Sequence, residues 1–308
     1  MITRRLALVA GALLVAAPPV LAAPGANTIT VRDLTPRFLA FYEAAMQPHA
    51  SPDQRWALWK QMYGFAAVPP TPEGEQMARQ LLDHAWDGYA AVLPRIRAGL
   101  AGFTPSPQAS LDAVTALLKP DQGVAIELLL YVGGLEKNAF TAKGASGLPT
   151  VAVSVEADPA ERAPILSHEM THAVQIAMGK MSGAWIRTIA ATVLGEGLAV
   201  RVSQALYPGR PEGEFIERQP GWLAQCAAKR SAILADVKGA LASNASGDIF
   251  KYTIGVGPAG VEREAYYAGW LVVEHWLKAG RSFADIARIA EADAPAAVGA
   301  AIDELLRA

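Results

Sequence analysis

The sequence has a single cysteine and almost no net charge. Its 308 residues include only Cys226, so no disulfide can form within the chain. The formal net charge is −2, from 27 lysines and arginines against 29 aspartates and glutamates, and there is no run of like charges. Such a chain lacks the positive surface expected of a protein that binds nucleic acid or an acidic membrane. Nucleic acid is therefore not an expected partner.

The N-terminus has the pattern of a secretory signal peptide. Two arginines precede an apolar run over residues 6–21, which two prolines interrupt, and small side chains at Val20 and Ala22 permit cleavage after Ala22. Residues 1–22 are therefore predicted to be a signal peptide. The alternative is a membrane anchor, but the run is shorter than the ~20 residues of a spanning helix. No later run of spanning length is expected, so we predict an exported protein, periplasmic or secreted, without stable membrane insertion after cleavage.

Residues 28–119 are predicted to form a helical N-terminal region. Prolines follow the capping residues Ser51 and Thr71, as is typical of the first turn of a helix. Beyond the first cap, Trp56, Trp59 and Tyr63 recur at helical spacing and indicate a face that packs into a core. Hydrophobic residues make up 52% of the chain, enough for one large core or two smaller ones.

Residues 120–308 are predicted to form a second domain in which strands precede helices. Three apolar, β-rich runs are separated by glycine-containing segments and lie at 125–132, 138–142 and 149–156. A long helix follows, beginning at Asp158 or Pro164 and ending near Gly179. Further helical segments are expected around 186–206, 220–243, 263–279, 283–292 and 296–307. The predicted fold class is α+β and mostly α.

The stretch LSHEMTHAVQ (166–175) places two of the chain's five histidines four residues apart on this long helix. Residues with that spacing lie on one face, so His168 and His172 can bind the same ion. Glu169 lies about 100° around the helix axis, where it can reach a water molecule without binding the ion. This is the HExxH arrangement, in which the histidines bind Zn²⁺ and the glutamate is the general base. The alternative is a hydrogen-bonded polar cluster without a metal.

A catalytic zinc site needs a third protein ligand beside an open position. The extended motif HExxHxxGxxH is excluded because Gln175 stands where it needs glycine. Glu196 is the better candidate, since its small neighbours Gly195 and Gly197 would let its helix approach the first one closely. The alternative for Glu196 is a buried ion pair with Arg201 or a role in helix capping.

Three motifs together resemble the glutamate-type zincins, or gluzincins, and in particular a bacterial family of zinc-dependent proteases. They are HEMTH (168–172), GEGLA (195–199) and YYAGWLVVEHWLKAG (266–280), and the resemblance covers roughly residues 120–280. It implies a zincin-like core with a small mixed sheet, an active-site helix and a following glutamate helix. It also implies one catalytic Zn²⁺ and assigns roles to four residues: the ligands His168, His172 and Glu196, and the general base Glu169.

The later helix offers a donor for the oxyanion that forms during peptide hydrolysis, because a phenol can donate a hydrogen bond without competing as a strong metal ligand. Tyr266 is the first candidate and Tyr267 the second, although both fit equally well as core residues. His275 is a further candidate, with a structural or surface role as its alternative. The strand at 151–155, if it lies at a sheet edge, would let a substrate peptide add to the sheet as another strand.

The sequence thus predicts an exported zinc metallopeptidase acting on peptide or protein substrates, and we expect an endopeptidase. In this interpretation a zinc-activated water attacks the peptide carbonyl while Glu169 takes its proton. The main alternative is a catalytically silent zinc-binding protein of the cell envelope that keeps a zincin fold. Intact Glu169 argues against that alternative, because a binding protein has no need of the base.

Overall fold

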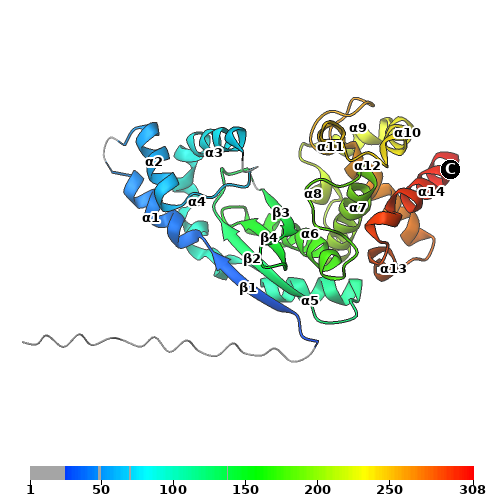
Figure 1. Cartoon of the computed structure of the whole chain (residues 1–308), viewed down its shortest axis with the longest axis horizontal. Helices are drawn as coiled ribbons and strands as arrows, with labels where there is room; N and C mark the ends of the chain where they lie inside the picture. Colours follow the sequence, from blue (N-terminus) through cyan, green and yellow to red (C-terminus); the bar gives the residue numbers. More distant parts are fainter. Residues whose placement is uncertain (1–24, 48–49, 69–70, 137) are drawn as a thin grey trace, which may run out of the picture.

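The computed structural model describes residues 25–308 except 48–49, 69–70 and 137, so the predicted signal peptide and His49 lie outside the described residues. The fold is α+β and mostly α, with one four-stranded sheet (Figure 1). The elements up to residue 120 are β1 (Thr28–Asp33), α1 (Thr35–Ala45), α2 (Pro52–Met62), α3 (Pro72–Ala85), η1 (Trp86–Gly88), α4 (Tyr89–Ala98), η2 (Gly99–Gly102) and α5 (Pro107–Leu118). The predicted helices of this region are therefore present, and the caps at Ser51 and Thr71 begin α2 and α3.

The sheet is mixed and has the strand order β1-β2-β4-β3. Strand β2 (Ala125–Tyr131) pairs in parallel with β1 and with β4 (Pro149–Ser154), and β3 (Ala139–Lys143) pairs antiparallel with β4. The three strands predicted after residue 120 are confirmed. Strand β1 was missed, although TITV alternates polar and apolar side chains, because the segment is short, half-buried or exposed, and contains no apolar run.

Residues 151–155 do not meet the condition for receiving a substrate strand, which is a place at the edge of the sheet. Residues 151–154 belong to β4, which is paired on both sides, and nearly all residues of β4 are buried. A continuous apolar run of this kind is typical of a strand inside a sheet. The edge strand next to β4 is β3, whose residues are half-buried, except for exposed Lys143.

Helices follow the sheet to the end of the chain. They are α6 (Pro159–Ala177), α7 (Ile189–Leu206), α8 (Gly213–Ile216), α9 (Trp222–Ala228), α10 (Arg230–Ala240), α11 (Ser246–Thr253), α12 (Glu264–Lys278), α13 (Phe283–Ala287), η3 (Glu291–Asp293) and α14 (Ala294–Arg307). Helix α6 packs against β3 and β4, α7 packs against α6, and α12 packs against α7. Figure 1 shows this succession, with α1 to α4 on the side of the sheet away from α7.

Local sequence explains where the two central helices begin. The Asp158 side chain accepts a hydrogen bond from the backbone N–H of Ala160, and Pro159 occupies the first turn, so α6 starts there and continues through Pro164. The Thr188 side chain caps α7 in the same way, by accepting from the N–H of Ala191. These caps fix the first residues of α6 and α7.

Helix α7 is long and apolar enough to cross a membrane by length and composition, contrary to the expectation that no such run follows the N-terminus. However, 83% of its apolar window is buried inside the protein, as in the core helix of a soluble domain. The buried hydrophobic residues of 28–119 and of 120–308 form one continuous cluster, which includes Cys226 on α9. The division of the chain into two domains stays a prediction.

Two glycines let α7 and α12 cross with their backbones in contact. A Cβ atom built on Gly197 would lie 2.8 Å from Cα of Gly269, and one built on Gly269 would lie 3.0 Å from the backbone nitrogen of Gly197. Gly195, by contrast, faces His172 on α6. The prediction that both glycines of GEGLA face α6 thus holds for Gly195 only, and Gly197 instead brings α12 close to α7.

Candidate metal centre

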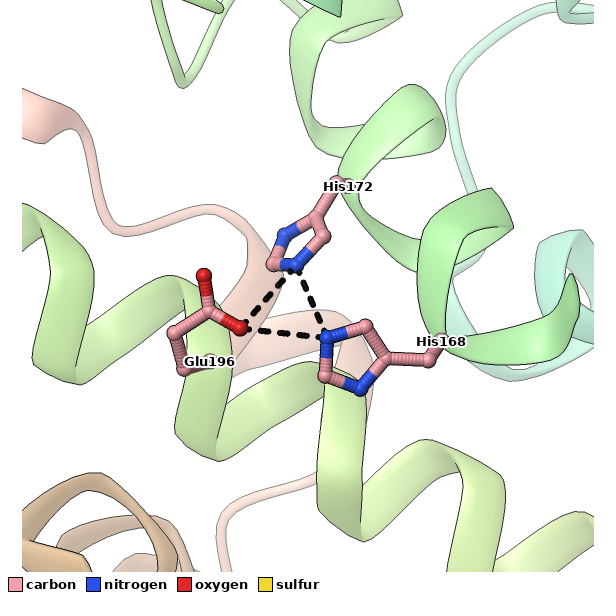
Figure 2. Close-up of side chains that lie close together, drawn as sticks. All are labelled: His168, His172 and Glu196. Atoms are coloured by element: carbon pink, nitrogen blue, oxygen red, sulfur yellow. Dashed lines mark hydrogen bonds and ion pairs between the residues drawn. The ribbon is translucent and has the colours of Figure 1, made fainter. Parts of the chain in front are cut away.

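Two helices bring together the three predicted metal ligands. His168 and His172 extend from α6 towards Glu196 on α7, and the three side chains meet between the helices (Figure 2). Their nearest ligand atoms, one from each residue, all lie within 4.8 Å of one another. This group could hold a metal ion.

The spacing of the three ligand atoms fits a small tetrahedral ion. His168 Nε2 lies 3.1 Å from Glu196 Oε2 and 3.2 Å from His172 Nε2, and His172 Nε2 lies 3.4 Å from the same carboxylate oxygen. Ligands placed ~2.0–2.1 Å from a tetrahedral zinc are about 3.3 Å apart. Two imidazole nitrogens and one carboxylate oxygen are also a donor set that suits zinc. The residues therefore fit the ion that the motif predicts.

The second oxygen of Glu196 is held by an arginine that the sequence did not indicate. Arg187, in the loop before α7, donates from Nη2 to Glu196 Oε1 at 2.9 Å and from Nε to the Thr192 hydroxyl at 3.2 Å. The alternative partner, Arg201, instead lies 3.3 Å from the carboxylate of Glu274. Arg187 therefore orients Glu196 so that only Oε2 faces the histidines, as a second layer of contacts commonly does at metal sites.

Burial and mutual charge act on these groups in opposite directions. Burial of Glu196 would raise its pKa, but the charges and hydrogen bonds of His172 and His168 hold the pKa well below the ordinary value. Burial of His168 would lower its pKa, but the hydrogen bond and charge of Glu196 outweigh this and raise it. The carboxylate is thus the anionic form that a metal ligand requires.

Glu169 lies beside the ligands, and its side chain is fixed by the edge strand. The residue is 8% exposed, and its Oε2 accepts a hydrogen bond of 2.7 Å from the hydroxyl of Thr141 on β3. The Thr141 hydroxyl also lies 3.0 Å from the Glu169 carbonyl oxygen. Among the described residues, Glu169 makes no ion pair with the two histidines or with an arginine, so its carboxylate remains available.

The three oxyanion candidates lie in different surroundings. Tyr267 is 3% exposed and packs against Trp222 and Trp270, so it is a core residue. His275 is hydrogen-bonded to Glu304 at 2.6 Å and lies nine residues, or about 13 Å along α12, from Tyr266.

Tyr266 is the candidate whose electrostatic surroundings include the metal ligand Glu196. Burial and the charge of Glu196 raise the pKa of Tyr266, whereas the charges of Arg263, Arg187 and Arg218 act to lower it. The phenol therefore lies within electrostatic range of the third ligand. Neither Arg263 nor Arg218 was recognised in the sequence as part of a site.

A small cavity of about 10 Å³, room for about one water molecule, adjoins the metal centre. Thr141, His172, Gln175, Arg187 and Glu291 contribute to its walls. Gln175 is fully buried, and neither its amide nitrogen nor its amide oxygen has a hydrogen-bond partner among the described residues. A buried amide of this kind is costly unless a ligand or water meets it. The cavity thus offers polar contacts one helical turn from His172.

Comparisons of this chain with known proteins do not identify a family. No family model, curated protein or solved structure matches it. The resemblance to the glutamate-type zincins therefore stays a prediction from HEMTH, GEGLA and the later helix. The structure contributes the geometry of the metal centre itself.

Proposed function

We propose that this chain is an exported, zinc-dependent metallopeptidase with a zincin-like core. The observation that carries the proposal is the triangle of His168, His172 and Glu196 ligand atoms, spaced as a tetrahedral zinc requires, with the Glu169 carboxylate beside it. A bound zinc ion supplies a Lewis acid for the peptide carbonyl and lowers the pKa of a water molecule towards ~7. The same triangle without Glu169 would suit a structural ion equally well.

Glu169 is the general base in this proposal. Its carboxylate takes a proton from the attacking water and then delivers that proton to the nitrogen of the leaving amine. The hydrogen bond from Thr141 holds Oε2 in one position, so the carboxylate does not need to be ordered when the substrate binds. A base of this kind typically contributes a rate factor of about 10² to 10⁴.

Tyr266 is the proposed oxyanion donor. Its hydroxyl would donate a hydrogen bond to the substrate oxygen as negative charge develops there. Arg187 keeps the Glu196 carboxylate turned towards the histidines. Each of these roles belongs to a residue that lies within electrostatic or hydrogen-bond range of the metal ligands.

Strand β3 is the proposed binding edge for the substrate backbone. It pairs with β4 on one side only, and it carries Thr141, the residue that contacts the general base. An extended peptide that added to β3 would pass in front of Glu169. This replaces the predicted role of residues 151–155, because β4 is paired on both sides.

The test compares the chain lacking residues 1–22 with Glu169→Gln and with the matched control Glu212→Gln, an exposed glutamate. Zinc content is measured by mass spectrometry, and peptidase activity is measured on a mixture of fluorogenic peptides. We expect one zinc per chain in all three, and activity in the wild type and the control only. Zinc binding without turnover in the wild type would favour the silent binding protein, and a chain that binds no zinc would overturn the proposal.

A further inference from the structure

Beyond the metal centre, a second cavity is lined by two arginines, one of which contacts the ring of Tyr266. It measures about 220 Å³, and its walls include Arg218, Arg263, Trp222, Gln225 and Glu262. Arg263 immediately precedes α12, and Arg218 lies in the segment between α8 and α9. Segments that are distant in sequence thus present two guanidinium groups to one cavity.

Arg263 is held in an unusual conformation. Its backbone φ is +56°, in the left-handed region that residues other than glycine rarely adopt. Backbone strain of this kind is commonly found at functional sites. The residue is 9% exposed, and its guanidinium lies 3.8 Å from the centre of the Tyr266 ring. The fold therefore fixes this cation directly beside the proposed oxyanion donor.

The charge of Arg263 is not neutralised within the protein. Its Nη1 donates to the carbonyl oxygen of Ile216 at 2.8 Å, but its buried Nε has no partner among the described residues. No carboxylate lies within 4 Å of it in the described part of the chain. A buried guanidinium without an acidic partner is unusual, because burial of an unpaired charge is costly. An anionic ligand would remove that cost.

Arg218 adds a second cation to the same cavity. It is exposed, and no hydrogen bond or ion pair within the described residues engages its side chain. Burial of part of the side chain and the charge of Arg263 lower the pKa of Arg218, so the two like charges act on each other. Glu262 is the acidic residue in the cavity wall, but it forms no ion pair with either arginine. The cavity therefore keeps a net positive charge.

We propose that Arg218 and Arg263 bind a carboxylate group of the peptide substrate beside the metal centre. Guanidinium groups bind carboxylates with paired, charge-assisted hydrogen bonds, and the face of Trp222 supplies an apolar wall for the adjoining side chain. This inference rests on the proposed peptidase function, because it takes the bound carboxylate to belong to a peptide substrate. The same chemistry has two sources in a peptide: the free C-terminus, which would make the enzyme a carboxypeptidase, and the side chain of Asp or Glu.

A binding experiment on metal-free protein tests the inference without any need for turnover. N-acetyl-phenylalanine is compared with its amide, and N-acetyl-glutamic acid α-amide is compared with N-acetyl-glutamine amide, by tryptophan fluorescence. We expect saturable binding of the C-terminal carboxylate, of the side-chain carboxylate, or of both, and much weaker binding of the neutral partners. The pair that shows the preference identifies the source. Equal binding of acid and amide in both pairs, or no binding of any acid, would overturn the inference.

Variants link the binding to the two arginines. Arg218→Gln changes an exposed side chain and should fold normally, whereas Arg263→Lys keeps the charge but loses the paired geometry. The matched control is Arg97→Gln, an exposed arginine on α4. We expect each of the two cavity variants to weaken carboxylate binding about 10- to 100-fold and the control to have no effect. Cavity variants that behave like the control would overturn the inference.

Activity measurements separate this inference from the proposed function. On the zinc-loaded enzyme, Arg218→Gln should raise KM for peptides that carry the preferred carboxylate and leave KM for their neutral counterparts unchanged. Carboxylate binding in a chain that holds no zinc and cleaves no peptide would overturn the proposed function alone. Efficient cleavage without any preference for a carboxylate would overturn only the inference drawn from Arg218 and Arg263.

Discussion

The close crossing of α7 and α12 predicts that two glycines only two residues apart respond in opposite ways to alanine. Gly195 and Gly197 both lie inside α7, on either side of the ligand Glu196. In a helix interior alanine is favoured over glycine by about 1 kcal/mol. The difference between the two sites lies in what the added methyl group would meet.

The magnitude follows from the neighbouring atoms. At Gly195 the methyl would lie 3.6 Å from Cε1 of His172, which is an ordinary contact. At Gly197 it would lie 2.8 Å from Cα of Gly269 and closer still to the carbonyl group of that residue. Carbon atoms pack at about 3.5–4.0 Å, so the helices would have to separate by about 1 Å. Overpacking of this kind costs about 1–3 kcal/mol, and backbone atoms yield less easily than side chains.

We therefore expect Gly197→Ala to lower the free energy of unfolding by up to about 2 kcal/mol after the gain in helix propensity, because rigid backbone atoms put the overpacking cost at the upper end of its range. Gly195→Ala should leave the free energy of unfolding unchanged or raise it by up to about 1 kcal/mol. Urea unfolding of the metal-free proteins, followed by circular dichroism, measures both values without a contribution from bound zinc. Gly269→Ala, on the other side of the crossing, should repeat the effect of Gly197→Ala. Equal stability of the Gly195 and Gly197 variants would refute the backbone contact between α7 and α12.

Two further predictions concern a buried carboxyl and the general base. Burial raises the pKa of Glu156 from 4.5 to about 7. Between pH 4.5 and about 7 the native state therefore keeps a proton that the unfolded state loses. Because of this difference, Glu156 makes the free energy of unfolding fall as the pH rises through that range. Urea unfolding should therefore show Glu156→Gln to be more stable than the wild type by up to about 3 kcal/mol at pH 8 and no more stable at pH 4. If the free energies of unfolding of the two proteins depended on pH in the same way, this prediction would be contradicted. Thr141→Val removes the hydrogen bond to Glu169 and should lower kcat about 10-fold with zinc content unchanged. The control Thr150→Val, on β4, should leave kcat unchanged. Equal kcat values for the two variants would exclude the positioning role of Thr141.

The parts of the site that sequence could predict are those set by local spacing. His168, Glu169 and His172 lie within one and a half turns of one helix, so their relative directions follow from helix geometry alone. Glu196 was found because the flanking glycines and its helical setting indicate a close approach to another helix. The strands at 125–132, 138–142 and 149–156 were found because apolar, β-rich runs alternate with glycine-containing turns.

The parts that sequence could not predict depend on contacts between distant segments. Arg187 lies in an irregular loop, where no periodicity shows the direction of a side chain, and Thr141 reaches Glu169 only because β3 lies beside α6. Strand β1 has no strong apolar pattern, and its place in the sheet comes from its pairing with β2, about 97 residues later. Arg263 gives no sequence signal, since its left-handed backbone is a property of the folded chain.

The single cysteine has a consequence for how this protein can be handled. Cys226 is fully buried in α9, and burial raises the pKa of its thiol to about 12. A thiol that stays protonated and out of contact with solvent reacts slowly with oxidants and with soft metal ions. The Cys226 thiol of the folded chain should therefore keep the same covalent form in reducing and oxidising surroundings. Purified protein can then be stored and loaded with metal in buffers free of thiol reductants, which would otherwise compete for zinc.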